Sequence, residues 1–377
     1  MACIIEKVIP GVRSLSIRWV DGHISTFHYL WLADNSPQSL NGKGQRLHDT
    51  MDLPSDIRPR ELYYSSEKGL EISWEQLPQP SFFSAVWLKM HCYSHQREIP
   101  QFSPWPGKDV NCDDFKAKSG EPYLAPGQNK LGGSTDEVDL IQAMRVVRLE
   151  GIATVQADSN LHGIRDLLKQ GTPQADLSTN FNCSCECELQ GLWEMRSWSP
   201  QWSGMHTEHP DWKSIPAFLR IRVLPSLPLR WELVLVDGFH FAEILRVHNP
   251  RVFALLSSIP VQFKENMRQP EPGVFRSIIE LNEAGAVTGV HYDPRSLAPF
   301  SISPGQMLDF YHAYQTFGRM IRDPRYQKRC RMLPGKLFII DNHRMLHGVL
   351  PATMTRNLIP EGHNSRIEYP EPCLLEV

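Results

Sequence analysis

Proline is the residue type that most constrains this fold, because 30 of the 377 residues are proline and they are spread along the whole chain. Proline has no backbone N–H, so it interrupts helices and central strands. We therefore expect long ordered loops, which suit a β-rich enzyme better than a helical bundle. The 30 prolines and 24 glycines make 54 residues, about 14% of the chain, well below the share typical of low-complexity chains.

The charge balance and the hydropathy exclude several classes of protein. The 39 basic and 42 acidic residues give a net charge of −3, so no basic field favours nucleic acid or an anionic membrane. No apolar run approaches the roughly 20 residues of a membrane span, and the first residues resemble neither a signal nor a transit peptide. We expect a soluble cytoplasmic protein that acts on a small molecule and has no nucleic-acid or membrane partner. A homodimer is left open.

Eight cysteines are scattered along the chain, and in an intracellular protein they are most simply reduced thiols. Three of them, Cys183, Cys185 and Cys187, alternate with other residues and share one face if the segment is a strand. Three thiolates can bind a soft metal, but a zinc site usually needs a fourth ligand, and none is near in the sequence. We favour reduced thiols here and leave metal binding open.

The first hundred residues contain a weak internal repeat. Trp19 and Trp74 each end an alternating segment, and a Trp-Leu pair follows each of them at 31–32 and 87–88. The pattern predicts a strand or hairpin leading to a short helical turn, twice over. We expect a small β-rich N-terminal module at 1–97 and then a linker at 98–132, which is rich in Pro, Gly, Ser and Asn.

The remaining residues, 133–377, are expected to form the main domain. Several segments of it carry strong secondary-structure signals. The patterns predict helices at 136–149, 160–169, 239–256 and 304–323, strands at 151–156, 231–236 and 337–340, and a hairpin at 277–292 that turns at 282–285. A predominance of strands over this length indicates a β-sandwich or barrel braced by helices.

Two segments carry the residues most suited to chemistry, 205–210 (MHTEHP) and 334–348 (PGKLFIIDNHRMLHG). His206 and Glu208 are two residues apart, so on a strand they point the same way. With a remote imidazole such as His347 they can form the facial triad that binds Fe(II) and leaves other coordination positions open.

The spacing alone is weak evidence, because the chain has three pairs of this kind. The pair at 206 and 208 competes with His209/Asp211 and with His291/Asp293. The segment 334–348 is the feature that favours the first pair.

Taken together, these motifs resemble the γ-butyrobetaine hydroxylase and trimethyllysine hydroxylase family of Fe(II)/2-oxoglutarate oxygenases, within the wider taurine dioxygenase-like group. The landmarks occur in the family's order: WVDG at 19–22, WLADN at 31–35, HTEHP at 206–210, VDGF at 236–239 and PG…DN.R.LHG at 334–348. The resemblance covers nearly the whole chain.

The resemblance implies a double-stranded β-helix, or jelly-roll, core that uses Fe(II), 2-oxoglutarate and O₂. It implies decarboxylation of 2-oxoglutarate to succinate, coupled to oxidation of an unactivated C–H bond by hydroxylation, desaturation or ring closure. By the same resemblance His206, Glu208 and His347 bind iron, and Arg366 clamps the far carboxylate of 2-oxoglutarate. Arg356 is the alternative clamp, since both arginines bracket the family's usual distance from the distal histidine.

Departures from the family pattern bear on metal and substrate. Glu208 stands where the family usually has Asp, and the family's zinc-binding cysteines are absent from the N-terminal module, where we expect no zinc site. The aromatic cage for a quaternary ammonium is only partly matched, with Trp198 and Tyr292 as candidate pocket walls and His209 in the place of an aromatic. Because a trimethylammonium group needs aromatic faces around it, this favours a small amino acid or amine as substrate.

Three other functions stay open at this point. One is γ-butyrobetaine or trimethyllysine hydroxylation in carnitine synthesis. The second is a catalytically silent relative kept as a binding protein. The third is a cupin-like metal protein that does not use 2-oxoglutarate.

Overall fold

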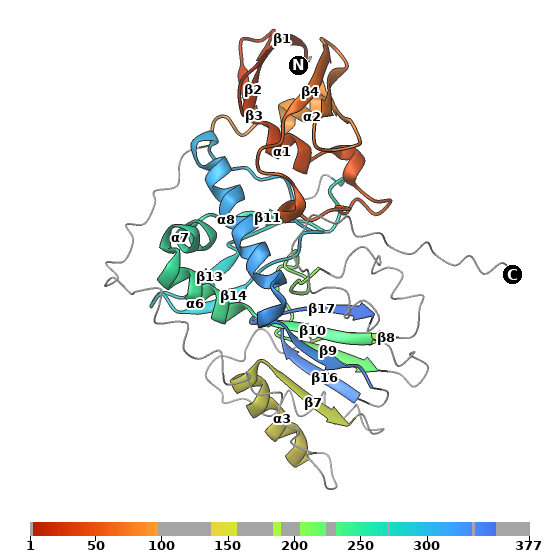
Figure 1. Cartoon of the computed structure of the whole chain (residues 1–377), viewed down its shortest axis with the longest axis vertical. Helices are drawn as coiled ribbons and strands as arrows, with labels where there is room; N and C mark the ends of the chain where they lie inside the picture. The colour runs from red at the N-terminus through yellow and green to blue at the C-terminus, as the bar shows by residue number, and fades with distance from the viewer. Residues whose placement is uncertain are drawn as a thin grey trace, which may run out of the picture.

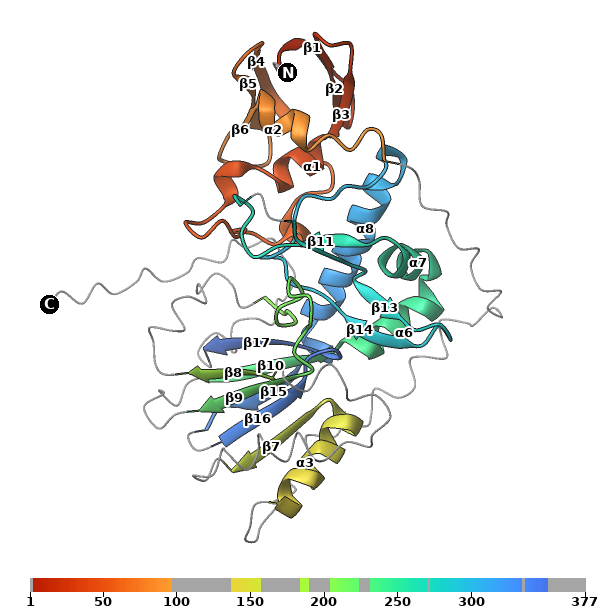
Figure 2. The same ribbon diagram turned by 180° about the vertical axis from the view of Figure 1, so that it is seen from behind.

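The computed structural model describes residues 3–96, 137–156, 184–189, 204–223, 231–269, 272–333 and 336–351. The expected linker at 98–132 and helix at 160–169 lie outside these ranges. The described parts form three layers along the long axis of the molecule (Figure 1). The N-terminal module lies at one end, a pair of sheets at the other, and three helices between them, an order that the reverse view repeats (Figure 2).

The N-terminal module consists of two similar units, each a three-stranded antiparallel sheet followed by a short helix. The first comprises β1 (Ile5–Pro10), β2 (Ser14–Trp19), β3 (Ile24–His28) and α1 (Tyr29–Asp34). The second comprises β4 (Pro59–Ser65), β5 (Gly69–Trp74), β6 (Ser81–Ser84) and α2 (Ala85–Met90). Two 3₁₀ turns, η1 (Pro37–Ser39) and η2 (Thr50–Asp52), lie between them.

The tryptophans of the sequence repeat occupy equivalent places in the two units. Trp19 ends β2 and donates from Nε1 to Ser25 Oγ at 2.8 Å, and Trp74 ends β5 and donates from Nε1 to Ser81 Oγ at 2.9 Å. Both rings are buried, so each anchors its own sheet. The predicted repeat of hairpin and short helix is therefore confirmed.

The other end of the molecule is a sandwich of two sheets. One sheet has the order β15-β10-β17 and the other β7-β16-β9-β8. Their strands are β7 (Ile152–Gln156), β8 (Ser184–Leu189), β9 (Phe218–Val223), β10 (Trp231–Asp237), β15 (Lys328–Arg331), β16 (Lys336–Asp341) and β17 (Met345–Pro351). This sandwich, with helices bracing it, is the jelly-roll core that the sequence predicted.

The apolar run of β16 packs on both of its faces. Phe338 and Ile340 point into the space between the two sheets, while Leu337 and Ile339 pack outward against helix α3 (Glu137–Glu150). A strand with both faces covered is apolar throughout instead of alternating. The strand prediction at 337–340 is confirmed on this account, as are those for β7 and β10 and for α3.

The middle layer contains the helices α6 (Gly238–His248), α7 (Pro250–Ser258) and α8 (Pro304–Arg322) and the short strands β11 (Val261–Phe263), β12 (Val274–Arg276), β13 (Ile279–Leu281) and β14 (Val287–Val290). A 3₁₀ turn, η4 (Pro324–Tyr326), follows α8. The predictions of α8 and of the β13–β14 hairpin are confirmed, and the hairpin turns at 282–285, where Gly285 takes a φ of 77°.

The single helix predicted at 239–256 is wrong, because the structure divides it into α6 and α7. Asn249 has a φ of −142° and caps α7 by accepting a hydrogen bond from Val252 N. Pro250 occupies the first turn of α7, where a missing N–H does no harm, whereas it cannot continue α6.

A buried polar network joins the N-terminal module to α8. Asp34 at the end of α1 forms an ion pair with Arg46 at 2.7 Å and accepts a hydrogen bond from Tyr311 of α8 at 2.8 Å. Nearby, Trp31 donates to the carbonyl of Phe300 at 2.9 Å. Because buried charges need partners, these contacts fix how the module sits against the rest of the molecule. No helix in the described segments is both long and apolar enough to span a bilayer.

Candidate metal centre

Two histidines from distant parts of the sequence lie directly opposite each other. His347 is on β17, where it pairs with Leu235 of β10, and His206 lies on an extended segment beside β17. The amide of His206 donates to the carbonyl of His347 at 3.0 Å, and the amide of His347 donates back at 2.9 Å. Two residues that exchange both backbone hydrogen bonds form a hydrogen-bonded pair of antiparallel strands, and this pairing places the two imidazoles side by side.

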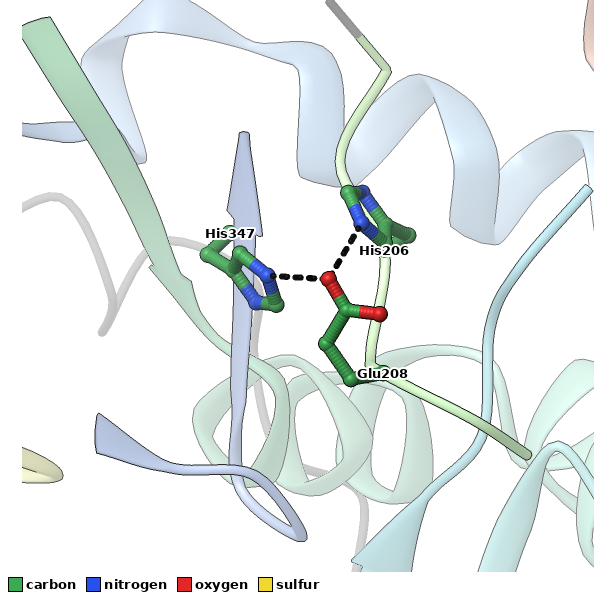
Figure 3. Close-up of side chains that lie close together, drawn as sticks. All are labelled: His206, Glu208 and His347. Atoms are coloured by element: carbon green, nitrogen blue, oxygen red, sulfur yellow. Dashed lines mark hydrogen bonds and ion pairs between the residues drawn. The ribbon is translucent and has the colours of Figure 1, made fainter. Parts of the chain in front are cut away.

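Glu208 completes the group (Figure 3). Its Oε1 lies 3.3 Å from Nε2 of His206 and 3.4 Å from Nε2 of His347. One ligand atom from each of the three residues lies within 4.8 Å of the others, and all three side chains are buried. Within the described residues this is the one group of three such side chains close enough to share a metal ion.

The donor set fits Fe(II). Nδ1 of His206 lies 3.1 Å from the carbonyl of Gly204, which can only accept, so Nδ1 carries the proton and Nε2 is left to coordinate. Two imidazole nitrogens and one carboxylate are the ligands of non-haem Fe(II) oxygenases, with the remaining positions open for other ligands. Nδ1 of His347 is buried and has no hydrogen-bond partner in the part of the chain that the structure describes.

The electrostatics of the group favour the protonation states that bind a metal. Burial raises the pKa of a carboxyl group, but the interactions of Glu208 with the neighbouring imidazoles of His206 and His347 outweigh burial and hold the pKa of Glu208 well below its usual range. Burial lowers the pKa of His347. Near neutral pH the group therefore contains a carboxylate and a neutral imidazole, which are the ligating forms.

Asn342 fixes the backbone that carries Glu208. Its Oδ1 accepts from the amide of Glu208 at 2.8 Å, and its Nδ2 donates to the carbonyls of Glu208 at 3.0 Å and Pro216 at 2.9 Å. The side chain is buried and uses three of its four hydrogen-bonding capacities here. Sequence reasoning did not assign a role to Asn342, although it lies inside the segment 334–348 that was singled out.

Tyr292 holds the residue between the two ligands of the first segment. Its carbonyl accepts from the amide of Thr207 at 2.8 Å, and its own amide donates to Thr207 Oγ1 at 3.0 Å. Its ring is buried and stacks on Tyr314, and its hydroxyl lies 3.3 Å from both carboxylate oxygens of Asp49 in the N-terminal module. These are the contacts of a positioning residue, and a role in the pocket wall stays a prediction.

His209 follows the three-residue metal segment in a strained conformation. Its φ is 53°, a left-handed value that is uncommon for a residue other than glycine. Its ring stacks on Trp212 with 3.8 Å between the ring centroids, and its Nδ1 lies 3.9 Å from the carboxylate of Asp211. His209 and Asp211 are not part of the group of three, and the substrate role predicted for His209 stays a prediction.

The third pair, His291 and Asp293, is divided between two other partners. Nε2 of His291 lies 2.8 Å from the carboxylate of Glu280, and Asp293 accepts from Nε of Arg295 at 3.0 Å. Of the three pairs with this spacing, only the first meets a third ligand among the described residues.

Some predicted site residues lie outside the described residues, namely Trp198, Arg356 and Arg366. Cys183 lies outside them too, while Cys185 and Cys187 fall on β8, which pairs in parallel with β9. The predictions for these residues stay predictions.

Comparison with protein-family models gives two matches. Residues 200–359 match the model described as taurine catabolism dioxygenase TauD, TfdA family. Residues 7–105 match the model described as gamma-butyrobetaine hydroxylase-like, N-terminal. The first match contains all three residues of the metal group.

Similar proteins match along most of their length. The chain is 26% identical to a gamma-butyrobetaine dioxygenase of Pseudomonas sp. (strain AK-1), over 88% of this chain and 85% of that protein. It is 24% identical to a trimethyllysine dioxygenase of Meyerozyma guilliermondii, over 92% of this chain and 89% of that protein. It is 23% identical to the gamma-butyrobetaine dioxygenase of Homo sapiens, over 92% and 90% respectively.

Proposed function

The chain belongs to the γ-butyrobetaine hydroxylase-like group of the TauD/TfdA dioxygenases, and we propose that it oxidises an unactivated C–H bond of a small amino acid or amine. Enzymes of this family are 2-oxoglutarate-dependent non-haem iron dioxygenases that use Fe(II), 2-oxoglutarate and O₂. The observation that carries the proposal is the convergence of His206, Glu208 and His347 within 4.8 Å.

In this proposal His206, Glu208 and His347 hold the iron. Iron bound there supplies the activation of O₂ that couples decarboxylation of 2-oxoglutarate to oxidation of the substrate. The protein keeps the three ligating atoms together by backbone pairing and through Asn342, and it buries them so that bulk water is largely excluded. A Glu in place of the family's usual Asp reaches the same point, since its Oε1 already lies between both imidazoles.

The preference for an amino acid over a betaine rests on His209. It lies one residue beyond the ligand Glu208, and its neutral imidazole can accept a hydrogen bond from a primary ammonium group. A trimethylammonium group has no N–H to offer and depends on aromatic faces instead. Replacement of an aromatic by His209 therefore supports a substrate with a free ammonium group.

Succinate formation tests the proposal directly. Purified protein with Fe(II), ascorbate and 2-oxoglutarate is assayed against small aliphatic amino acids, γ-butyrobetaine and trimethyllysine, and the succinate formed in the absence of substrate is subtracted. We expect the fastest coupled turnover with an amino acid. Faster turnover with γ-butyrobetaine contradicts the assignment of an amino-acid substrate but still supports a 2-oxoglutarate-dependent oxidation.

The second candidate function is hydroxylation of γ-butyrobetaine or trimethyllysine. It is favoured by the similarity to gamma-butyrobetaine and trimethyllysine dioxygenases over nearly the full length of the chain. The same assay separates it from the first candidate. A catalytically silent relative forms no succinate with any substrate, and a cupin-like protein binds iron without binding 2-oxoglutarate.

We also propose that Arg366 clamps the far carboxylate of 2-oxoglutarate, with Arg356 as the alternative. A guanidinium group meets a carboxylate with two parallel hydrogen bonds. Arg366→Ala should weaken 2-oxoglutarate binding about ten- to a hundredfold and leave metal binding intact. If only Arg356→Ala has this effect, Arg356 is the clamp.

The remaining predictions concern organisation. We propose an N-terminal module at 1–97, a linker at 98–132 and an oxygenase domain at 133–377, a division that the separate family matches at 7–105 and 200–359 support. We also propose a cytoplasmic protein with a small-molecule substrate. Sedimentation velocity tests the open question of a homodimer.

A further inference from the structure

A second charged pair lies beside the metal group. The backbone of Tyr292 is hydrogen-bonded to Thr207, so the residues that follow Tyr292 run next to the segment with His206 and Glu208. Asp293 is the next residue, and its Oδ1 accepts hydrogen bonds from both the amide and Nε of Arg295, at 3.2 and 3.0 Å.

The charges of this pair act on the metal group. The carboxylate of Asp293 interacts with His206, and the guanidinium of Arg295 interacts with Glu208 and with His347. Burial alone lowers the pKa of an arginine, but the carboxylates of Asp293, Glu208 and Asp211 outweigh it and raise the pKa of Arg295. Arg295 is therefore a permanent cation next to the three ligands.

Only one side of Arg295 is used by the protein. Nε is bonded to Asp293, whereas neither Nη atom donates a hydrogen bond within the described residues. The side chain of Arg295 is 21% exposed and that of Asp293 only 9%. Asp293 thus balances the charge from the buried side, and the Nη edge of the guanidinium stays accessible.

A guanidinium edge held in this way suits a carboxylate, because two N–H groups in one plane match its two oxygens. We propose that Arg295 is a specificity-determining residue whose Nη edge binds a carboxylate of an organic acid seated at the metal group. This inference rests on the proposed function. Since the far carboxylate of 2-oxoglutarate is assigned to Arg366 or Arg356, the carboxylate of the amino-acid substrate is left for Arg295.

Binding to the Mn(II)-loaded protein tests this without turnover. Titration calorimetry first compares 2-oxoglutarate with 2-oxopentanoate, which has the same chain without the far carboxylate. In the presence of 2-oxoglutarate it then compares L-norvaline, L-leucine and L-valine with n-butylamine, isoamylamine and isobutylamine. Each amine is the matching amino acid without its carboxylate, so the ratio of the two affinities isolates the contribution of that group.

Arg295→Gln should reduce the amino-acid affinity about ten- to a hundredfold and leave the amine affinity unchanged. If Arg295→Gln instead removes the difference in affinity between 2-oxoglutarate and 2-oxopentanoate, the carboxylate that Arg295 binds belongs to the cosubstrate. Arg295→Lys keeps the charge without the planar fork, so its amino-acid affinity should lie between those of the wild type and Arg295→Gln. Arg268→Gln, at an exposed arginine that contacts the carbonyl of Gly42, is the matched control.

Two outcomes overturn the proposal. One is an unchanged affinity ratio in Arg295→Gln, whether both affinities stay the same or acid and amine lose equally. The other is a wild-type protein that binds Mn(II) but none of these carboxylates. Mn(II) content is measured for every variant, so that a damaged metal group is recognised. A failure of the proposed function has a different signature. In that case carboxylates bind through Arg295, but Fe(II)-loaded protein forms no succinate with any substrate.

Discussion

Two segments with the same spacing of histidine and acid lie side by side in this protein and have different roles. In the segment 206–208 the histidine and the acid converge on one point, and His347 joins them there. In the segment 291–293 the histidine turns to Glu280 and the acid to Arg295. The two segments are even bonded to each other, through their middle residues Thr207 and Tyr292.

The difference between the segments lies in their partners. In the second segment each of the two side chains has a partner of its own: His291 contacts Glu280, and Asp293 contacts Arg295, so both are satisfied within the protein. In the first segment, the side chains within hydrogen-bonding distance of the Glu208 carboxylate, among the described residues, are two imidazoles, and both can also coordinate a metal ion. Spacing makes a metal site possible, and the residue on the neighbouring strand decides whether one forms.

Removal of the third ligand should have the largest effect and make the first segment resemble the second. His347→Ala takes away one of three ligands, so Fe(II) affinity should fall by more than the roughly 10–100-fold that changes around the ligands cost. Calorimetry with Mn(II) or Fe(II) under nitrogen measures this. His209→Ala is the control and should keep its metal. Stoichiometric iron in His347→Ala places the site elsewhere.

Asn342 offers the next largest effect, because it holds the backbone on both sides of Glu208 without touching metal. Asn342→Ala leaves three backbone groups without their partner, which should reduce metal affinity about 10–100-fold and stability by about 1–3 kcal/mol. Asn282→Ala, in the hairpin turn, is a matched control that should lower stability alone. Equal metal affinity in both variants refutes a positioning role for Asn342.

Tyr292 sharpens the comparison, since it joins the second segment both to the first segment and to the N-terminal module. Tyr292→Phe removes the hydroxyl that contacts the buried Asp49 and keeps the backbone bonds to Thr207. We expect a loss of about 1–3 kcal/mol in urea unfolding and little change in metal affinity. Unchanged stability with altered substrate preference instead assigns the Tyr292 hydroxyl to the pocket wall.

The smallest effect concerns the ion pair of the second segment. The hydrogen bond from His291 lowers the pKa of Glu280 below its ordinary value of 4.5 in the folded protein. The contribution of this carboxylate to stability is therefore complete above about pH 4.5 and is lost as the pH falls below it.

Because half of the Glu280 side chain is exposed, solvent screens the pair, and we expect about 0.5 kcal/mol or less. Urea unfolding between pH 3 and 6 measures how the free energy of unfolding changes with pH, and Glu280→Gln should make this dependence slightly weaker. A larger loss of stability in Glu280→Gln at pH 7 means that the pair contributes more than its exposure indicates.

Local patterns in the sequence were enough to predict the helices and strands whose apolar side chains recur with a simple period. Helix α8 shows its three- and four-residue spacing of apolar residues, and the tryptophan repeat marks the two units of the N-terminal module. The motif at 334–348 also pointed to the three residues that the structure brings together, because it carries His347. The break at Asn249 and Pro250 was missed, since the apolar pattern continues across it while the backbone does not.

The tertiary structure decided which groups near the centre face one another. The sequence shows three equivalent pairs of histidine and acid, and it cannot show that His206 lies opposite His347, that Asn342 reaches the backbone of Glu208, or that Asp293 turns to Arg295. Such contacts depend on strand pairing between segments more than a hundred residues apart in the sequence, or on the direction that one side chain takes in a loop. Local spacing determines which faces of a segment are apolar or polar, and only the packing of the whole chain determines what those faces meet.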